Sequence, residues 1–284
     1  MSDPREPLAA ALRTCLASDI PAILVRVAEA RGSTPRGTDA AMLVTQHATQ
    51  GTIGGGQLEF HAIDVARDLM VAGARQQRLA IALGAHLGQC CGGHVTLEFS
   101  CASPQSAAML AQDEAALART FVPVLIFGAG HTGRALASAL APLPFAVTLV
   151  DDRADTLGEL PANIATRRLD DPVVAIFEAR PHTAFVILTH SHALDYRLTQ
   201  AALLRGDAAY AGMIGSATKR ARFARWFLAC AGTQAQLATL VCPIGGAAVA
   251  DKHPAVIAAL TAAQLLARCP SEALTQPARS ACLA

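Results

Sequence analysis

The stretch VPVLIFGAGHTGRALASALA, residues 122–141, decides the fold of the second half of this 284-residue chain. A continuous apolar segment runs into a glycine-rich turn, and helical spacing follows the turn. The turn fits G-x-G-x-x-G, whose glycines allow a tight turn, close approach of the backbone to a phosphate and close helix packing. An acid at the end of the next apolar strand could bind a ribose hydroxyl. The residues expected to contact a nucleotide are Gly128, Gly130, His131, Gly133 and Asp151.

Apolar segments alternate with helical segments beyond this motif. Strands are expected over 146–152, 183–192 and 210–215, and a final helix over 254–268. Strands that are apolar throughout and alternate with helices are typical of a parallel sheet covered on both faces. The sequence therefore predicts a Rossmann-like doubly wound domain over residues 121–284. A fold of this kind whose nucleotide site has been lost or re-used is the alternative.

Polar side chains follow two of these strands, at the edge where ligands of this fold gather. THSHALD places His190, His192 and Asp195 after one strand, and in a strand the two histidines would share a face. Such residues could bind a metal ion, but orienting a ligand or capping the next helix is the favoured interpretation. IGSATKRARF places Ser216 and Lys219 in the first turns of a helix, which suits an anion or an ordinary basic surface.

The first 120 residues have a different pattern and predict a separate domain. A helix is expected over 57–75, and a linking helix over 103–120 with Ser103 as its cap and Pro104 in its first position. The expected strands lie at 22–32, 41–46, 78–84 and 94–100, and a further strand is expected to end in TIGGG, 52–56. Together these segments predict a small mixed-sheet α/β domain with glycine-rich loops.

Two loops of this domain have the composition of an anion site. RGSTPRG, residues 31–37, combines arginines with hydroxyl side chains, and TIGGGQLE runs three consecutive glycines into a helix. Backbone N–H groups of such a glycine turn can cradle a phosphate, although a tight turn under close packing is the alternative. Glu59, in the first turn of that helix, is interpreted as an acid that favours the helix dipole. The candidate residues are Arg31, Ser33, Arg36, Gly54, Gly55 and Gly56.

A third loop, LGQCCGGH at residues 87–94, places two adjacent cysteines between a glutamine and two glycines. A zinc site normally separates its paired cysteines by two or more residues, and neighbouring cysteines form a disulfide only with strain. The glycines indicate a backbone that comes close to another group. Gln89, Cys90 and Cys91 are therefore candidates for binding a cofactor.

Composition narrows the classes of function. Hydrophobic residues make up 52% and charged residues 16%, which is typical of a globular protein, and a net charge of +1 gives no support for a nucleic-acid surface. The start of the chain shows no secretory signal, and the longest apolar stretch, 256–267, is too short to span a bilayer. The eight cysteines are expected to be reduced thiols in a cytoplasm. A homodimer is expected on general frequency alone.

Taken in order, these motifs resemble those of the xanthine dehydrogenase accessory proteins, the XdhC/CoxI family. ARGSTPRG, GTIGGGQLE, LGQCCGG, FGAGHTGRAL, VDDR, THSHALD, IGSATKRARF, CPIGG and KHPAVIAA follow one another along the chain. The resemblance extends from about residue 20 to residue 268. Their ordered combination is more specific than any single motif. Thr132, Ala217 and Asp251 depart from the residues that are common in the family, and the departures at Ala217 and Asp251 put the anion contacts at those two turns in doubt.

The resemblance implies a maturation chaperone rather than an enzyme. Such proteins bind the molybdenum cofactor, protect it while a cysteine desulfurase adds a sulfido ligand, and deliver it to apo-xanthine dehydrogenase. The implied partners are that apo-subunit, the cysteine desulfurase and the proteins of molybdenum cofactor biosynthesis. Cys90 and Cys91 would contact molybdenum or handle sulfur, since thiolates suit soft metals. A nucleotide at the Rossmann motif is a further expected ligand.

Two other functions stay open at the level of the sequence. The glycine motif and Asp151 would also suit an NAD(P)-dependent oxidoreductase, although no companion catalytic pair stands out. A metal-dependent hydrolase around His190, His192 and Asp195 is the third hypothesis.

Overall fold

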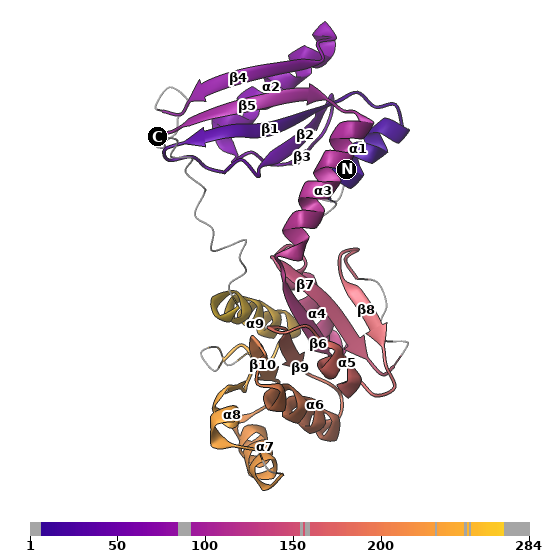
Figure 1. Cartoon of the computed structure of the whole chain (residues 1–284), viewed down its shortest axis with the longest axis vertical. Helices are drawn as coiled ribbons and strands as arrows, with labels where there is room; N and C mark the ends of the chain where they lie inside the picture. Colours follow the sequence, from indigo (N-terminus) through magenta and orange to yellow (C-terminus); the bar gives the residue numbers. More distant parts are fainter. Residues whose placement is uncertain are drawn as a thin grey trace. The chain divides into compact units, whose positions relative to one another are not determined.

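The computed structural model describes residues 7–84, 92–153, 156, 160–230, 232–246, 249 and 251–269. The chain divides into two compact units, shown in Figure 1. The first extends to Leu117 and the second begins at Ala118, three positions before the expected boundary.

The first unit is built on an antiparallel sheet with the strand order β3-β2-β1-β5-β4. Its strands are β1 (Ala22–Arg31), β2 (Ala41–Thr45), β3 (Thr49–Gly51), β4 (Gln76–Ala82) and β5 (His94–Cys101). All four pairings among these strands are antiparallel, so the sheet differs in this respect from the mixed sheet that we expected. The α/β class itself is confirmed.

Helices cover both faces of this sheet. Successive side chains of β1 point to opposite faces, and each face has a hydrophobic core of its own. Helix α2 (Gly56–Ala72) packs on one face, where Val25 belongs to its core. Helices α1 (Leu8–Ala17) and α3 (Pro104–Arg119) pack on the opposite face of the sheet, and Leu24 belongs to the core on that face. The predicted cap of α3 is confirmed, since the Ser106 N–H donates to the Ser103 hydroxyl at 3.1 Å. Helix α1 was not predicted.

The second unit has a parallel sheet with the strand order β11-β10-β9-β6-β7-β8. Its strands are β6 (Val122–Phe127), β7 (Phe145–Asp151), β8 (Ala165–Arg168), β9 (Ala184–Ile187), β10 (Tyr210–Met213) and β11 (Leu240–Val241). Numbered within the unit, this is the order 3-2-1-4-5-6 of the Rossmann fold, and the doubly wound prediction is confirmed. The topology reverses between β6 and β9, which is where ligands of such sheets bind.

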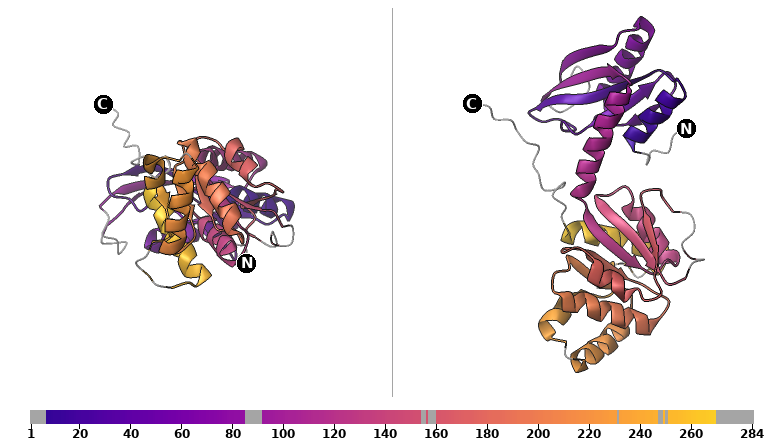
Figure 2. Two further views of the ribbon diagram at one scale, coloured as in Figure 1. Left: turned by 90° about the horizontal axis from the view of Figure 1, so that it is seen from below. Right: turned by 45° about the vertical axis from the view of Figure 1, so that its right-hand side comes forward.

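Helices flank this sheet on both sides (Figure 2). Helix α4 (His131–Leu140) and the correctly predicted α9 (Pro254–Arg268) share one core. The other core is covered by α5 (Val173–Glu178), α6 (His192–Arg205), α7 (Ala217–Ala229) and α8 (Gln234–Ala238). No helix among the described residues is both long enough and apolar enough to cross a membrane.

Candidate functional site

The glycine turn between β6 and α4 has the geometry that its motif predicts. A Cβ at Gly128, where φ is +113°, would overlap the carbonyl oxygen of Leu188, and one at Gly133 would overlap that of Gly128. Gly130 is different: no described atom lies within 4 Å of a Cβ built there. The first and third glycines are therefore needed for packing, and the second leaves space over the start of α4, whose first residue is the exposed His131.

Asp151 lies at the end of β7, as predicted, but its carboxylate is engaged within the chain. It accepts a hydrogen bond from the Ala129 N–H at 2.6 Å. It also accepts three from Arg153, donated by the backbone N–H at 3.0 Å, Nε at 3.0 Å and Nη2 at 3.2 Å. Burial by itself raises its pKa, but the Arg153 guanidinium and the two backbone donors outweigh burial and hold the pKa far below its usual range. Arg153 was not singled out from the sequence, although VDDR contains it.

Asp195 forms a buried ion pair at the same edge of the sheet, beyond the end of β9. Its carboxylate accepts from the N–H of Thr189 at 2.9 Å and from the Thr189 hydroxyl at 2.8 Å. The Lys219 ammonium lies 2.5 Å away on α7, with only 11% of its side chain exposed. Ser216 caps α7 by accepting from the Lys219 N–H at 3.2 Å. Lys219 therefore neutralises an internal carboxylate, and a contact with an external anion stays a prediction.

The histidines of THSHALD do not share a strand face. Strand β9 ends at Ile187, and Ser191 caps α6 by accepting from the Leu194 N–H at 3.4 Å. His190 and His192 are both exposed, and His190 Nδ1 lies 4.0 Å from Asp152 Oδ1. Within the described part of the chain, no group of three or more His, Cys, Asp or Glu side chains could hold a metal ion. Ser191 thus caps the helix and Asp195 is engaged with Thr189 and Lys219, whereas a role of His190 and His192 toward a ligand stays a prediction.

Cys242, which we did not single out, follows β11 at the same edge of the sheet. Its thiol is half-buried, and burial raises its pKa. Lys219, Arg220 and Asp195 are the charged groups that affect it. The signal for this position was the motif CPIGG, which in the structure directly follows β11.

Two loops of the first unit and the described end of a third, Gly93, meet at one end of its sheet. A Cβ at Gly93 would overlap the Ser33 carbonyl oxygen and would lie 2.7 Å from that of Arg31. A Cβ at Gly54 would lie 2.6 Å from the Cβ of Pro35. The glycine turn and the last glycine of LGQCCGGH therefore both pack against the RGSTPRG loop. Ser33 and Arg36 are exposed there, and Arg31 Nη2 lies 3.2 Å from Glu29 Oε2.

The glycine turn before α2 already has an acceptor. The Glu59 carboxylate accepts from the Thr52 hydroxyl at 2.6 Å, the Gly55 N–H at 3.1 Å and the Ile53 N–H at 3.3 Å. Gly54, Gly55 and Gly56 have φ of +130°, +79° and +64°, which other residues rarely adopt. The interpretation of Glu59 as a first-turn acid is supported, and an external anion at this turn stays a prediction.

Gln89, Cys90 and Cys91 lie outside the described residues. The two sides of their loop are paired in the sheet, where Ala82 is opposite His94, and the Leu83 N–H donates to the Gly93 carbonyl at 2.8 Å. A hollow of about 510 Å³ lies beside this point, on the sheet face opposite α2. Its lining includes Glu29, Arg31, Ala82, His94 and Thr96.

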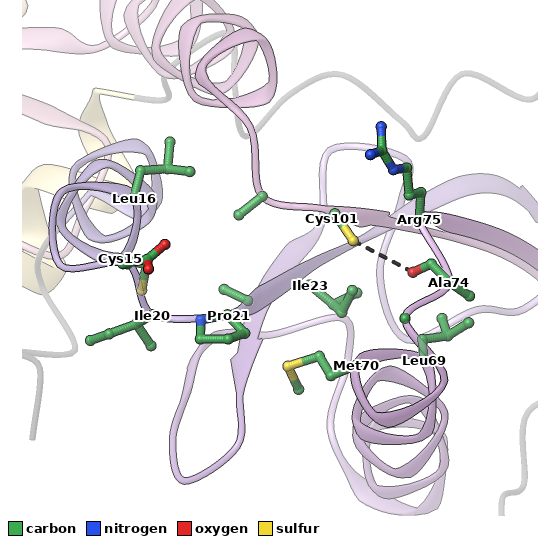
Figure 3. A pocket seen from close by; sticks show the side chains of 14 residues that line it. Cys15, Leu16, Ile20, Pro21, Ile23, Leu69, Met70, Ala74, Arg75 and Cys101 are labelled. Carbon is green, nitrogen blue, oxygen red and sulfur yellow. Dashed lines mark hydrogen bonds between the residues drawn. The ribbon is translucent and has the colours of Figure 1, made fainter.

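Another pocket of the first unit, of about 340 Å³, is shown in Figure 3. Cys15, Met70 and Cys101 contribute to its wall, and the Cys101 thiol donates to the Ala74 carbonyl at 3.5 Å. The pocket involves the start of β1, the end of β5 and the end of α2. The three converging loops involve the opposite ends of those elements, so this pocket belongs to a different part of the unit.

Comparisons with known proteins agree with this architecture. The family model of the XdhC Rossmann domain matches residues 124–265, half of the chain, and that of the XdhC and CoxI family matches residues 15–80. A crystal structure from Bacillus halodurans, described as a xanthine dehydrogenase, has a TM-score of 0.69 at 17% identity. The likeness covers 95% of this chain and 98% of that one, and it shows a common fold.

One curated protein shares a short segment with the chain. The UDP-N-acetylmuramoylalanine–D-glutamate ligase of Mycolicibacterium smegmatis is 62% identical over 39 residues. The match spans 14% of this chain and only 8% of the ligase, so nothing about activity follows from it. The two family models, in contrast, match a part of each unit in the expected order. The chain belongs to the XdhC family.

Proposed function

We propose that this protein binds the molybdenum cofactor, protects it during sulfuration and delivers it to apo-xanthine dehydrogenase. Membership of the XdhC family supports a role in xanthine dehydrogenase maturation. The observation that carries the finer proposal is the convergence of the three loops, because Gly93 and Gly54 both pack against the RGSTPRG loop.

The chemistry of these loops suits the parts of the cofactor. The molybdenum cofactor is a pterin with a terminal phosphate and a dithiolene that holds the metal. Arg31 and Arg36 offer guanidinium groups, which pair well with phosphate. Cys90 and Cys91 belong to the loop that ends at Gly93, and thiolates are soft ligands that suit molybdenum or sulfur transfer. The cofactor is then cargo, and the protein acts as an accessory factor without turnover of its own.

The proposal includes the partners that this cargo requires. The apo-subunit of xanthine dehydrogenase receives the cofactor, a cysteine desulfurase supplies the sulfur, and the biosynthesis proteins supply the unsulfurated form. All of this takes place in the cytoplasm, and the protein acts as a homodimer.

The experiment is retention of released molybdenum cofactor under anaerobic conditions. After desalting, we expect about one molybdenum and one pterin per chain on the wild-type protein. Cys90→Ala with Cys91→Ala should lose most of both, because the soft ligands are gone. The matched control is Cys101→Ala with Cys230→Ala, which removes two exposed thiols from other parts of the chain and should retain the cofactor. Absence of retention by the wild type would contradict the proposal.

A second pair of variants tests the convergence of the loops. Gly93→Ala places a Cβ against the Ser33 and Arg31 carbonyls, whereas no described atom lies within 4 Å of a Cβ at Gly92. We expect Gly93→Ala to reduce retention about tenfold or more and Gly92→Ala to leave it unchanged. Equal retention in both would show that the contact between the loops does not matter. Circular dichroism of each variant would establish that the fold is intact.

An NAD(P)-dependent oxidoreductase is the second candidate, favoured by the open space at Gly130. It requires a nucleotide to bind at the Rossmann edge. Calorimetric titration with NAD and NADP tests this requirement, and an absence of heat with both would remove the candidate. The same titration compares the affinities for NAD and NADP, and the residues at the end of β7 lead us to expect a difference between them.

A further inference from the structure

The end of β7 does not offer the acceptor that a Rossmann site normally provides for NAD. There, an acid at this position accepts a hydrogen bond from the ribose 2′-hydroxyl. Asp151 occupies the position, but it is only 3% exposed and takes four N–H donors from Ala129 and Arg153. A ribose hydroxyl could reach this carboxylate only by displacing the Arg153 guanidinium.

The remainder of the turn fits a dinucleotide well. Gly128 and Gly133 are needed for packing, and the space over Gly130 would admit a diphosphate at the start of α4. Among the described residues, the only feature here that does not fit an NAD site is thus the carboxylate of Asp151, which would bind the ribose 2′-hydroxyl. It changes which dinucleotide the edge can accept, and it leaves the rest of the site as the fold implies.

Guanidinium groups lie where the acceptor would be. The Arg153 side chain is 40% exposed while it contacts Asp151. Arg168, opposite Asp151 in the pairing of β7 with β8, is 57% exposed. Arg168 donates from Nε to the Asp152 carbonyl at 3.3 Å and pairs with the exposed Asp170 at 3.2 Å. Arginine forks match the geometry of phosphate oxygens, and they have no acceptor to offer a hydroxyl.

We infer that the Rossmann unit takes a dinucleotide with a 2′-phosphate, and that Arg153 is the residue that distinguishes it from the 2′-hydroxyl form. Asp151 holds Arg153 in place instead of binding ribose. Arg168, on the neighbouring strand, adds a second guanidinium at the same end of the sheet. The inference is independent of cofactor retention by the first unit, so either can fail without the other.

Calorimetry on the wild-type full chain tests the inference without any substitution. NADP should bind with a dissociation constant at least about tenfold below that of NAD, because charge-assisted hydrogen bonds form only with the phosphate. Adenosine 2′,5′-bisphosphate and 5′-AMP form a smaller pair that differs only in the 2′-phosphate, and they should show the same preference. The inference would be overturned if NAD bound as tightly as NADP or more tightly. It would also be overturned if neither dinucleotide bound.

Substitution of Arg153 tests its role. Arg153→Ala should abolish the preference for NADP by weakening NADP and strengthening NAD, since Asp151 is then uncovered. Arg153→Lys should keep part of the preference, because it keeps the charge and loses the fork. The control is Arg167→Ala, which removes a partly exposed arginine paired with Glu178 in the same unit and should leave both affinities unchanged. A preference that persists in a folded Arg153→Ala variant would exclude Arg153 as the reader.

Discussion

Asp151 and Glu59 show how single carboxylates satisfy glycine turns from within the chain. Each accepts backbone N–H groups beside a turn where the sequence predicted an external ligand. Their positions could be predicted, because spacing along a strand or from a helix start fixes them. Their partners could not be, because the guanidinium of Arg153 and the hydroxyl of Thr52 reach them only through particular side-chain torsions.

At this scale, Asp151→Asn should lower the free energy of unfolding by about 2 kcal/mol at pH 7, because hydrogen bonds to a buried charge are lost. The folded-state pKa of Asp151 lies below that of the unfolded chain, which is about 3.9. The carboxylate therefore stabilises the fold above about pH 4, and this contribution is lost as the pH falls further. Urea unfolding at pH 7 and at successively lower pH should show the two proteins converging.

Asp171→Asn provides the comparison for that experiment. Asp171 pairs with Arg197 at 3.2 Å, but both side chains are more than half exposed. Surface pairs of this kind contribute little, so its loss should change the stability only slightly at any of these pH values. A similar small change in Asp151→Asn would contradict the structural role given to that residue.

Among the elements, apolar strands and long helices could be predicted, and exposed or short ones could not. Strands β6 and β9 are nearly continuous apolar runs. Strand β8, with the sequence ATRR, is a largely exposed edge strand, so it lacks the hydrophobic pattern that reveals a strand. Helix α5 has only six residues, too few for a helical period to be recognised. The central strands are present as predicted, although β9 ends at Ile187 and not at residue 192.

The junction of β6 and α4 gives an expectation at the scale of elements. Gly133→Ala should destabilise the second unit by about 3 kcal/mol, because a Cβ would meet the Gly128 carbonyl and force α4 away from the strand. Gly130→Ala should cost less than about 1 kcal/mol, since the space there is open and φ is −70°. Thermal unfolding of both variants measures the difference, and equal transitions would show that the helix is not packed as described.

The whole molecule consists of two units that each bury their own cores. The clusters of the first unit contain residues up to Leu110, and those of the second begin at Val124. This division could be predicted from the change in pattern after residue 120, because antiparallel hairpins and alternating strands and helices differ in their periodicity. The convergence of distant loops, such as Gly93 with Ser33, could not be, because pairing register and packing decide it.

A fragment that begins at Thr120 should therefore fold alone. We expect cooperative thermal unfolding, because its hydrophobic core is complete without the first unit. Its preference between NADP and NAD should equal that of the full chain. A fragment without a cooperative transition by circular dichroism would show that the second unit depends on the first.

The order of the strands in the second sheet also has a consequence for synthesis on the ribosome. Strand β6 is made first and lies in the middle of the sheet, but its partner β9 follows much later, since Val124 pairs with Ala184. At about 5–20 residues per second, the intervening 60 residues take roughly 3 to 12 s to translate. During that interval one side of an apolar strand has no neighbour, and such an edge readily pairs with other chains. The nascent second unit thus passes through a period in which aggregation competes with folding.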